Sequence, residues 1–342
     1  MEHVPVIDLA PARVGRAADR RDVARLIDRA CIEIGFFAIT GHGVSELVCR
    51  DLRDAGHRFF SLPIELKRRA SPIDERAPRG YHALGGEALS AANDAVAPPD
   101  LKEFYHVGPV DVGGDPYYTS ARGRQFFLPN IWPDDPPEFR PAAIAYYRTM
   151  HELVGFLMRL TALGLGIEET FFDDKVSRSI GTMRLNYYPR QVHPPLAGQL
   201  RAGAHTDYGT LTILRQDAVG GLEVLGPGGR WAGVEPVPGA FVINIGDLMA
   251  RWTNDRWRST LHRVVVPPDP AVSAARRQSM PYFQNANWSA EVSCLPTCLE
   301  PGDKPRYEPV FAGPHLMAKF RRSVTLPAGD NAGHPGETHR DE

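Results

Sequence analysis

A stretch that joins two metal-binding side chains to a β-strand pattern decides the fold: Gly203-Ala204-His205-Thr206-Asp207-Tyr208-Gly209-Thr210-Leu211-Thr212-Ile213-Leu214. From residue 210 onward, alternating side chains predict a strand that begins just after a turn. His205 and Asp207 lie two positions apart, so an extended backbone directs both side chains to the same side. The stretch therefore supplies two candidate metal ligands at the edge of a strand.

A third candidate ligand, His262, follows about 55 residues after Asp207, on a predicted strand over residues 261–266. Two imidazoles and one carboxylate can hold one face of a six-coordinate metal and leave the opposite face open, which is the ligand set of non-haem Fe(II) oxygenases. A His-x-Asp pair also occurs as a structural hydrogen bond, and the chain has 12 histidines. The surrounding sequence is needed to choose between these interpretations.

Further short strands are predicted over residues 222–225 and 241–245, with another that ends near residue 188. Glycine or proline turn signals separate the strands after residue 203, at roughly ten-residue spacing, which is typical of a barrel or jelly roll. Arg277 and Ser279 also lie two positions apart, and a guanidinium beside a hydroxyl is a good receptor for a carboxylate. Tyr188 can add a phenolic donor to it. Alternatively, Arg277 is a surface ion-pair residue and Tyr188 a core aromatic residue.

Several motifs together resemble one family. They are His-x-Asp with the distal His262, Arg-x-Ser at 277–279, Asn-Tyr-Tyr-Pro at 186–189, Val-Pro-Val-Ile-Asp-Leu at 4–9, and Gly-Phe-Phe-Ala-Ile-Thr-Gly-His-Gly-Val at 35–44. From about residue 5 to about residue 316, the chain resembles the isopenicillin N synthase-like branch of the Fe(II)/2-oxoglutarate-dependent dioxygenases. Gly41 stands where this family commonly has Asn.

The resemblance implies an α+β, mainly β fold, with a double-stranded β-helix (jelly-roll) core, an N-terminal helical α/β extension and buttressing helices. It implies that Fe(II) is bound by His205, Asp207 and His262, and that 2-oxoglutarate is bound by Arg277, Ser279, Tyr188 and Asn186. The implied enzyme is an oxidoreductase that uses O2 to oxidise, most simply to hydroxylate, an unactivated C–H bond of a small metabolite. It releases succinate and CO2, and ascorbate supports its activity.

Other functions remain open at this point. An oxidase of the same fold that does not use 2-oxoglutarate, such as one that closes a ring, has the same metal ligands and Arg-x-Ser motif. An ethylene-forming enzyme is a further alternative. Outside this class, a non-catalytic binding protein could retain the pocket, and a zinc hydrolase could use two His and one Asp but would not need the carboxylate receptor.

Helical periodicity predicts helices over residues 19–34, over 45–60 with Ser45 as N-cap, and after Pro141. We expect residues 1–110 to form the N-terminal α/β extension and substrate-covering region, 111–323 the jelly-roll core with its long helix, and 324–342 a disordered tail. Residues 77–136 are rich in Gly, Pro and polar side chains.

In the resembled family the region around residues 77–136 helps to cover the substrate, so we expect Tyr81 and Tyr105 to line the pocket. Phe283 should join them, because it lies six residues beyond Arg277 and shares its face of an unbroken strand. His42, His82 and His106 are not expected to bind iron.

The remaining composition restricts the partners and the compartment. A net charge of −2 gives no sign of nucleic acid or of an anionic membrane, and the 4 cysteines do not resemble a disulfide framework. No run of apolar residues is long enough to span a membrane. We therefore expect a cytoplasmic enzyme with a small-molecule substrate, while its oligomeric state stays open.

Overall fold

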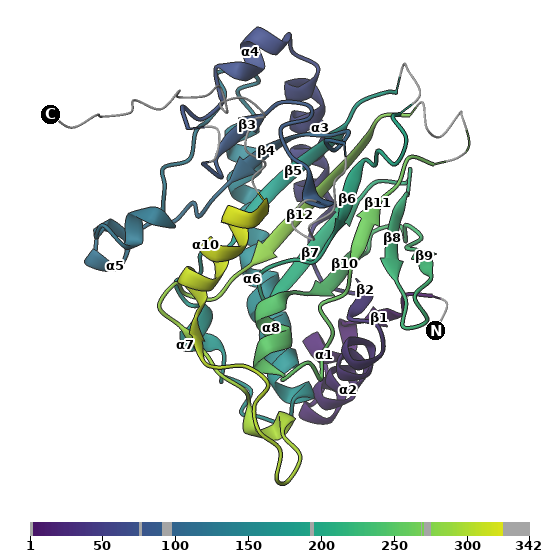
Figure 1. Ribbon diagram of the computed structural model, residues 1–342, viewed down its shortest axis with the longest axis vertical. Helices are drawn as coiled ribbons and strands as arrows, with labels where there is room; N and C mark the ends of the chain where they lie inside the picture. Colours follow the sequence, from purple (N-terminus) through teal and green to yellow (C-terminus); the bar gives the residue numbers. More distant parts are fainter. Residues whose placement is uncertain are drawn as a thin grey trace, which may run out of the picture.

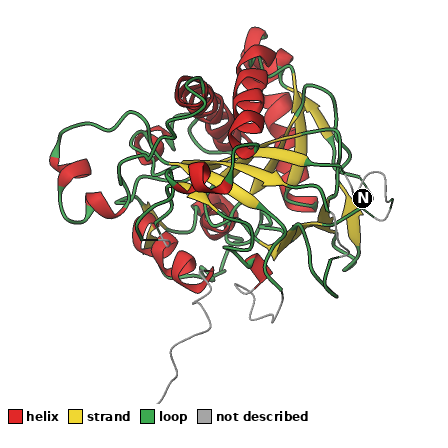
Figure 2. Ribbon diagram, turned by 90° about the horizontal axis from the view of Figure 1, so that it is seen from above, coloured by secondary structure: helices red, strands yellow, loops and turns green. Residues whose placement is uncertain are grey.

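The structure, a computed structural model, describes residues 3–74, 77–90, 98–191, 195–267, 269 and 275–323. A larger β-sheet with the strand order β1-β2-β10-β7-β12-β5-β4-β3 and a smaller one with the order β6-β11-β8-β9 form its centre (Figure 1). Helices cover the outer face of the larger sheet (Figure 2). This is the α+β, mainly β jelly roll that the sequence predicts.

The strands of the larger sheet are β1 (Val6–Asp8), β2 (Phe36–Thr40), β10 (Phe241–Ile245), β7 (Leu211–Gln216), β12 (Arg277–Gln284), β5 (Thr182–Tyr188), β4 (Glu103–Val107) and β3 (Gly80–His82). The smaller sheet consists of β6 (Ala202–His205), β11 (His262–Val264), β8 (Leu222–Leu225) and β9 (Trp231–Gly233). A separate pair joins β13 (Glu291–Val292) to β14 (Val310–Phe311). The helical segments are α1 (Ala10–Val14), α2 (Ala17–Glu33), α3 (Glu46–Phe60), α4 (Ile64–Arg68), α5 (Pro116–Thr119), η2 (Gly123–Gln125), α6 (Phe139–Gly164), α7 (Asp173–Val176), α8 (Asp247–Trp252), η3 (Pro296–Cys298) and α10 (Ala312–Ser323).

Alternation along the strands gives the larger sheet two different faces. On β12, the odd-numbered residues Arg277 and Ser279 line the inner pocket. The even-numbered Met280 and Tyr282 belong to the main core with the helices, and Tyr146 of α6 donates a hydrogen bond to the Met280 carbonyl at 3.0 Å. Because successive side chains point to opposite faces, one strand supplies both the packed core and the functional pocket.

Three of the helices confirm the sequence predictions, namely α2, which was predicted over residues 19–34, α3 and α6. In α3 the Ser45 hydroxyl accepts a hydrogen bond from the Leu47 N–H at 3.3 Å, as expected for an N-cap. The buried face of α3 includes Cys49, Leu52 and Phe59. Helix α6 starts at Phe139, two residues before the predicted start at Pro141, and packs against α2 and α3. No helix in the described part of the chain is long and apolar enough to cross a membrane.

The segment before residue 110 contributes both edges of the larger sheet. At one edge β1 pairs with β2, which pairs with β10, and at the other β3 pairs with β4, which pairs with β5. Backbone hydrogen bonds therefore join the expected N-terminal extension to the expected jelly-roll core. The expected tail, residues 324–342, lies outside the described residues.

The expectation that Tyr81 and Tyr105 line the pocket is wrong. The two residues are register partners on β3 and β4, and both are buried in the core on the helix-covered face. Their rings lie 5.7 Å and 5.1 Å from the ring of Phe59 in α3. The pocket face of β4 carries the next residue in the alternation, His106, instead.

We predict that Tyr105→Phe lowers the free energy of unfolding by about 1 kcal/mol and leaves 2-oxoglutarate affinity unchanged. The Tyr105 hydroxyl donates a hydrogen bond to the Ile131 carbonyl at 2.6 Å, and a typical intramolecular hydrogen bond contributes about that much. Urea denaturation and titration calorimetry measure the two quantities. A large change in 2-oxoglutarate affinity without a loss of stability would contradict the core position.

Candidate metal and cosubstrate site

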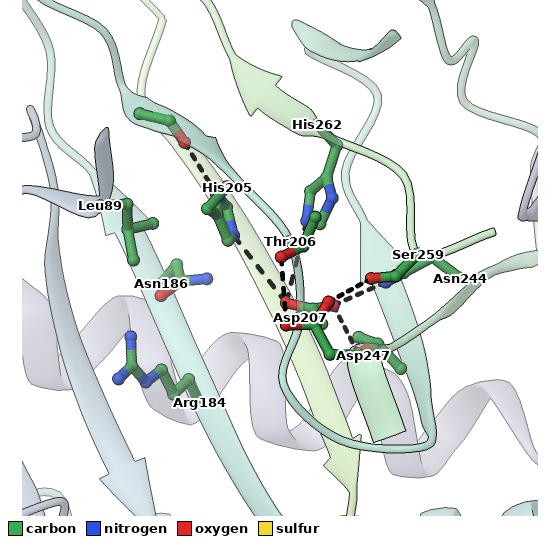
Figure 3. Close-up of polar contacts among 12 residues, drawn as sticks. Leu89, Arg184, Asn186, His205, Thr206, Asp207, Asn244, Asp247, Ser259 and His262 are labelled. Atoms are coloured by element: carbon green, nitrogen blue, oxygen red, sulfur yellow. Dashed lines mark hydrogen bonds and ion pairs between the residues drawn. The ribbon is translucent and has the colours of Figure 1, made fainter. Parts of the chain in front are cut away.

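Antiparallel pairing of β6 with β11 brings the two histidines together. His262 at the start of β11 is the register partner of His205 at the end of β6. Asp207 lies two residues after His205 in the chain. Each His Nε2 lies 3.9 Å from Asp207 Oδ1, and one ligand atom from each residue lies within 4.8 Å of the others (Figure 3). Within the described ranges, no other group of three or more His, Cys, Asp or Glu side chains has a metal-binding arrangement.

Backbone carbonyls orient both imidazole rings. His205 Nδ1 lies 2.7 Å from the Gly203 carbonyl oxygen, and His262 Nδ1 lies 3.1 Å from that of Thr260. A proton on each Nδ1 donates to these carbonyls, so each Nε2 keeps its lone pair for a metal. Burial first, and then the neighbouring His262 ring, lower the pKa of His205 below its usual range, so its imidazole is neutral at pH 7.

One oxygen of the Asp207 carboxylate is already occupied. Asp207 Oδ2 accepts hydrogen bonds from Asn244 Nδ2 at 2.6 Å and from the Thr212 hydroxyl at 2.5 Å. Burial by itself raises the pKa of Asp207, but the two imidazoles and these two donors outweigh burial and lower it. Asp207 is therefore ionised, with Oδ1 directed toward the two imidazoles.

Asp247, at the start of α8, forms hydrogen bonds with both segments that carry metal ligands, the one around Asp207 and the one that leads to His262. Its backbone N–H donates to the Asp207 carbonyl at 2.8 Å, and its side chain accepts from Ser259 at 2.6 Å and from Thr206 at 3.4 Å (Figure 3). Just before it, the backbone at Gly246 approaches that of Gly209, and a Cβ at Gly246 would lie 2.3 Å from the Gly209 carbonyl oxygen. The sequence indicates only a turn at Gly246 and Asp247, and their part in holding the ligands follows from the fold.

Neighbouring strands β12 and β5 build the candidate carboxylate receptor. Arg277 is the register partner of Tyr188, and Ser279 that of Asn186. The Arg277 guanidinium is completely buried, lies 4.8 Å from the centre of the Tyr188 ring, and donates from Nε to the Gly220 carbonyl at 2.8 Å. No described residue accepts a hydrogen bond from its Nη1, or donates one to Asn186 Oδ1, although both atoms are buried. A buried, incompletely paired cation is costly, so this arrangement suits an anionic ligand.

A single pocket contains both groups. It is lined by Phe36, Glu87, Leu89, Lys102, His106, Thr182, Arg184, Asn186, Tyr188, Ala202, His205, Thr206, Asp207, Tyr208, Gly209, Thr212, Leu214, Leu222, Asn244, His262, Val264, Arg277, Ser279, Pro281, Phe283, Asn285, Leu316 and Phe320. Phe283 lines it, as the strand alternation predicts. Sequence analysis missed Arg184 and His106, although Arg184 shares the alternation of Asn186 and Tyr188 on β5. The functions of Thr212 and Asn244 had no local signal, because tertiary packing alone brings them to Asp207.

A jelly roll with two imidazoles and a carboxylate around one point, beside a buried carboxylate receptor, is typical of non-haem Fe(II) oxygenases that use a 2-oxo acid. Comparisons with known proteins agree. Residues 179–286 match the model of the 2OG-Fe(II) oxygenase superfamily, and residues 4–135 match that of the non-haem dioxygenase in morphine synthesis N-terminal region.

Individual relatives cover nearly the whole chain. The 2-oxoglutarate-Fe(II) type oxidoreductase hxnY of Emericella nidulans is 36% identical over 325 residues, covering 93% of this chain and 90% of the relative. Validamycin A dioxygenase of Streptomyces hygroscopicus subsp. limoneus is 32% identical over 357 residues, covering 99% and 95%. The crystal structure of a full-length Neurospora crassa protein in complex with alpha-KG and thymine superimposes with a TM-score of 0.81 at 30% identity, covering 93% of this chain and 96% of that one.

The chain therefore belongs to the 2OG-Fe(II) oxygenase superfamily. It is an oxidoreductase that depends on Fe(II), 2-oxoglutarate and O2. The comparisons favour this function over the oxidase that does not use 2-oxoglutarate.

Proposed function

We propose that His205, Asp207 and His262 hold Fe(II) and that Arg277, Ser279, Tyr188 and Asn186 hold 2-oxoglutarate. The proposal rests on one observation. One ligand atom from each of the three side chains lies close to the other two, while the second polar atom of each side chain is already hydrogen-bonded. Each imidazole uses Nδ1 on a carbonyl, and Asp207 uses Oδ2 on two donors. The remaining atoms, the two imidazole Nε2 atoms and Asp207 Oδ1, face one another, which is what a metal site requires.

The side chains of the pocket bind and orient the cosubstrate. Arg277 and Ser279 bind its distal carboxylate, and the ring of Tyr188 supports the guanidinium from one side. Apolar side chains of the pocket that cluster with Tyr188, among them Leu214, Leu222 and Val264, exclude water. When bound, Fe(II) with O2 and 2-oxoglutarate supplies the oxidation of a substrate C–H bond, with release of succinate and CO2. The protein's own contribution is to position the reactants.

We infer a small metabolite as the substrate and hydroxylation as the simplest outcome. In support, the similar Neurospora crassa structure contains thymine, and relatives in rice and soybean are named homoarginine-6-hydroxylases.

The Asn-Tyr-Tyr-Pro and Arg-x-Ser motifs favour the isopenicillin N synthase-like branch of the superfamily. The cytoplasm, where reduced iron and 2-oxoglutarate are available, is the compartment that suits this chemistry. Phe283 is proposed to contact the substrate.

The experiment that tests this function starts with anaerobically purified protein, Fe(II), ascorbate and 2-oxoglutarate. O2 is then admitted, and succinate and ethylene are measured with and without a library of small metabolites. Succinate formation stimulated by a library member supports the oxygenase. O2 uptake without any succinate would favour the oxidase, and ethylene in the absence of substrate would favour the ethylene-forming activity.

We predict that Thr212→Val raises the dissociation constant for Fe(II) about 10- to 100-fold, the usual effect of removing a partner of a metal ligand. The variant keeps the side-chain shape but removes the hydrogen bond to Asp207 Oδ2. Thr210→Val is the matched control, because the buried Thr210 hydroxyl donates to the Gln284 carbonyl instead. Anaerobic Fe(II) titration measures both. Equal Fe(II) affinities for the two variants would contradict the metal assignment of Asp207.

A further inference from the structure

A second polar cluster lies in the pocket away from Arg277. Along β5, the side chains of Tyr188, Asn186 and Arg184 alternate on the pocket face. Arg184 lies four residues from Tyr188, which corresponds to about 13 Å along a strand. In Figure 3, Arg184 and Asn186 lie on the same side of His205. If 2-oxoglutarate occupies the Arg277 end, the Arg184 end is left for the substrate.

Arg184 is held in place by an ion pair and has further hydrogen-bond donors that the ion pair does not use. Its Nη1 donates to both carboxylate oxygens of Glu87, at 3.0 Å and 3.1 Å. Lys102 Nζ lies 2.8 Å from Glu87 and 3.0 Å from Asp100, so two cations and two carboxylates form one buried network. The Nε and Nη2 groups of Arg184 have no hydrogen-bond partner among the described residues. They are available to a molecule in the pocket.

His106 lies beside Arg184 as its register partner on β4. It lines the pocket, is only 1% exposed, and neither ring nitrogen has a hydrogen-bond partner among the described residues. Burial, together with the charges of Arg184 and Arg79, holds the pKa of His106 well below its usual range. The neutral ring offers one donor and one acceptor, and leaving both unpaired in a buried site is unfavourable.

The charges around the pocket restrict what can bind. Glu87 and Asp100 balance Arg184 and Lys102. At the other end, Fe(II) and Arg277 would balance Asp207 and the two carboxylates of 2-oxoglutarate. A charged substrate would therefore be buried without a counter-charge, which is costly in a site with little water. The ring of Phe283, 6.0 Å from the Arg184 guanidinium, adds a flat apolar surface.

We propose that Arg184, His106 and Phe283 select a neutral, planar substrate that carries an amide or lactam group. Its carbonyl oxygen accepts a hydrogen bond from Arg184, its own N–H donates to the His106 nitrogen that carries no proton, and its ring packs on Phe283. An amide supplies this combination of an acceptor and a donor side by side. The inference rests on the proposed function, which determines the end of the pocket that the substrate occupies.

The test measures binding rather than turnover. Protein loaded with redox-inert Zn(II) and saturated with 2-oxoglutarate is titrated with 2-pyridone, a neutral lactam, by ligand-observed NMR. Comparison probes of similar size are N-methyl-2-pyridone without the N–H, benzoate as an anion and benzylammonium as a cation. We expect 2-pyridone to bind about tenfold more tightly than each of the other three, in keeping with the loss of one hydrogen bond or the burial of an unbalanced charge.

Variants assign the effect to residues. His106→Phe keeps a ring but removes both nitrogens, and should weaken 2-pyridone binding about tenfold. His82→Phe is the matched control and should leave binding unchanged. His82 on β3 and His106 on β4 share one face of the sheet, but His82 does not line the pocket. Arg184→Lys, which keeps the charge next to Glu87 but loses the planar fork, should also weaken binding.

Calorimetric titration with 2-oxoglutarate separates the possible failures. If wild-type protein binds 2-oxoglutarate but prefers benzoate or benzylammonium, or binds none of the probes, the substrate inference is overturned. It is equally overturned if His106→Phe and Arg184→Lys both bind 2-pyridone as wild type does. If wild-type protein does not bind 2-oxoglutarate at all, the proposed function itself fails.

Discussion

Asp207→Ala is expected to abolish Fe(II) binding and turnover together. Asp207 carries the only negative charge among the three proposed ligands, and without it two neutral imidazoles remain. Loss of an outer partner of a metal ligand already costs about 10- to 100-fold in affinity, so loss of the carboxylate ligand should cost more than about 100-fold. Anaerobic Fe(II) titration and succinate release from the same protein sample measure the two effects.

The control for this variant is Asp28→Ala. Asp28 is also a hydrogen-bonded carboxylate, but its partners are Arg256 and the Trp257 indole, and it does not line the pocket. This variant should lose stability and keep its Fe(II) affinity. Fe(II) binding by Asp207→Ala at wild-type affinity would remove the basis of the metal assignment.

Arg277→Ala is expected to raise the dissociation constant for 2-oxoglutarate by about 30-fold to several thousand-fold. Loss of one partner from a buried charge-assisted pair costs about 2–5 kcal/mol, which corresponds to this range. Arg277 is fully buried with an unpaired Nη1, so solvent cannot replace it as a partner for the carboxylate. Titration calorimetry with 2-oxoglutarate measures the effect, and succinate release at saturating 2-oxoglutarate should recover part of the activity.

The adjacent Arg276 provides the matched control, because it is exposed while Arg277 is buried. Arg276→Ala removes the same charge one position away and should change 2-oxoglutarate affinity little, since a solvent-exposed charge is screened. If both variants had the same affinity as wild type, the cosubstrate would have to bind elsewhere in the pocket.

The sequence predictions were accurate where the residues concerned lie close together in the chain. His205 with Asp207, and Arg277 with Ser279 and Phe283, are each spaced along one strand, and regular alternation predicted that each set shares a face. The prediction that Tyr81 and Tyr105 line the pocket was wrong. It came from the substrate-covering region of the resembled family and not from a strand pattern, and a place in that region does not tell which face of a strand is turned to the pocket and which to the helices. On β4 the pocket face carries His106, the residue after Tyr105.

The sequence by itself determined the strand and helix pattern, the local pairs of ligands and the family, because periodicity, turn residues and short motifs are properties of neighbouring positions. Only the tertiary structure decided which distant groups meet. Asn244 on β10 reaches Asp207, and His106 on β4 lies beside Arg184 on β5, because strand pairing brings together residues far apart in the chain. A burial environment belongs to the packed fold rather than to any segment, so the unpaired nitrogens of His106 become visible only when every neighbour is in place.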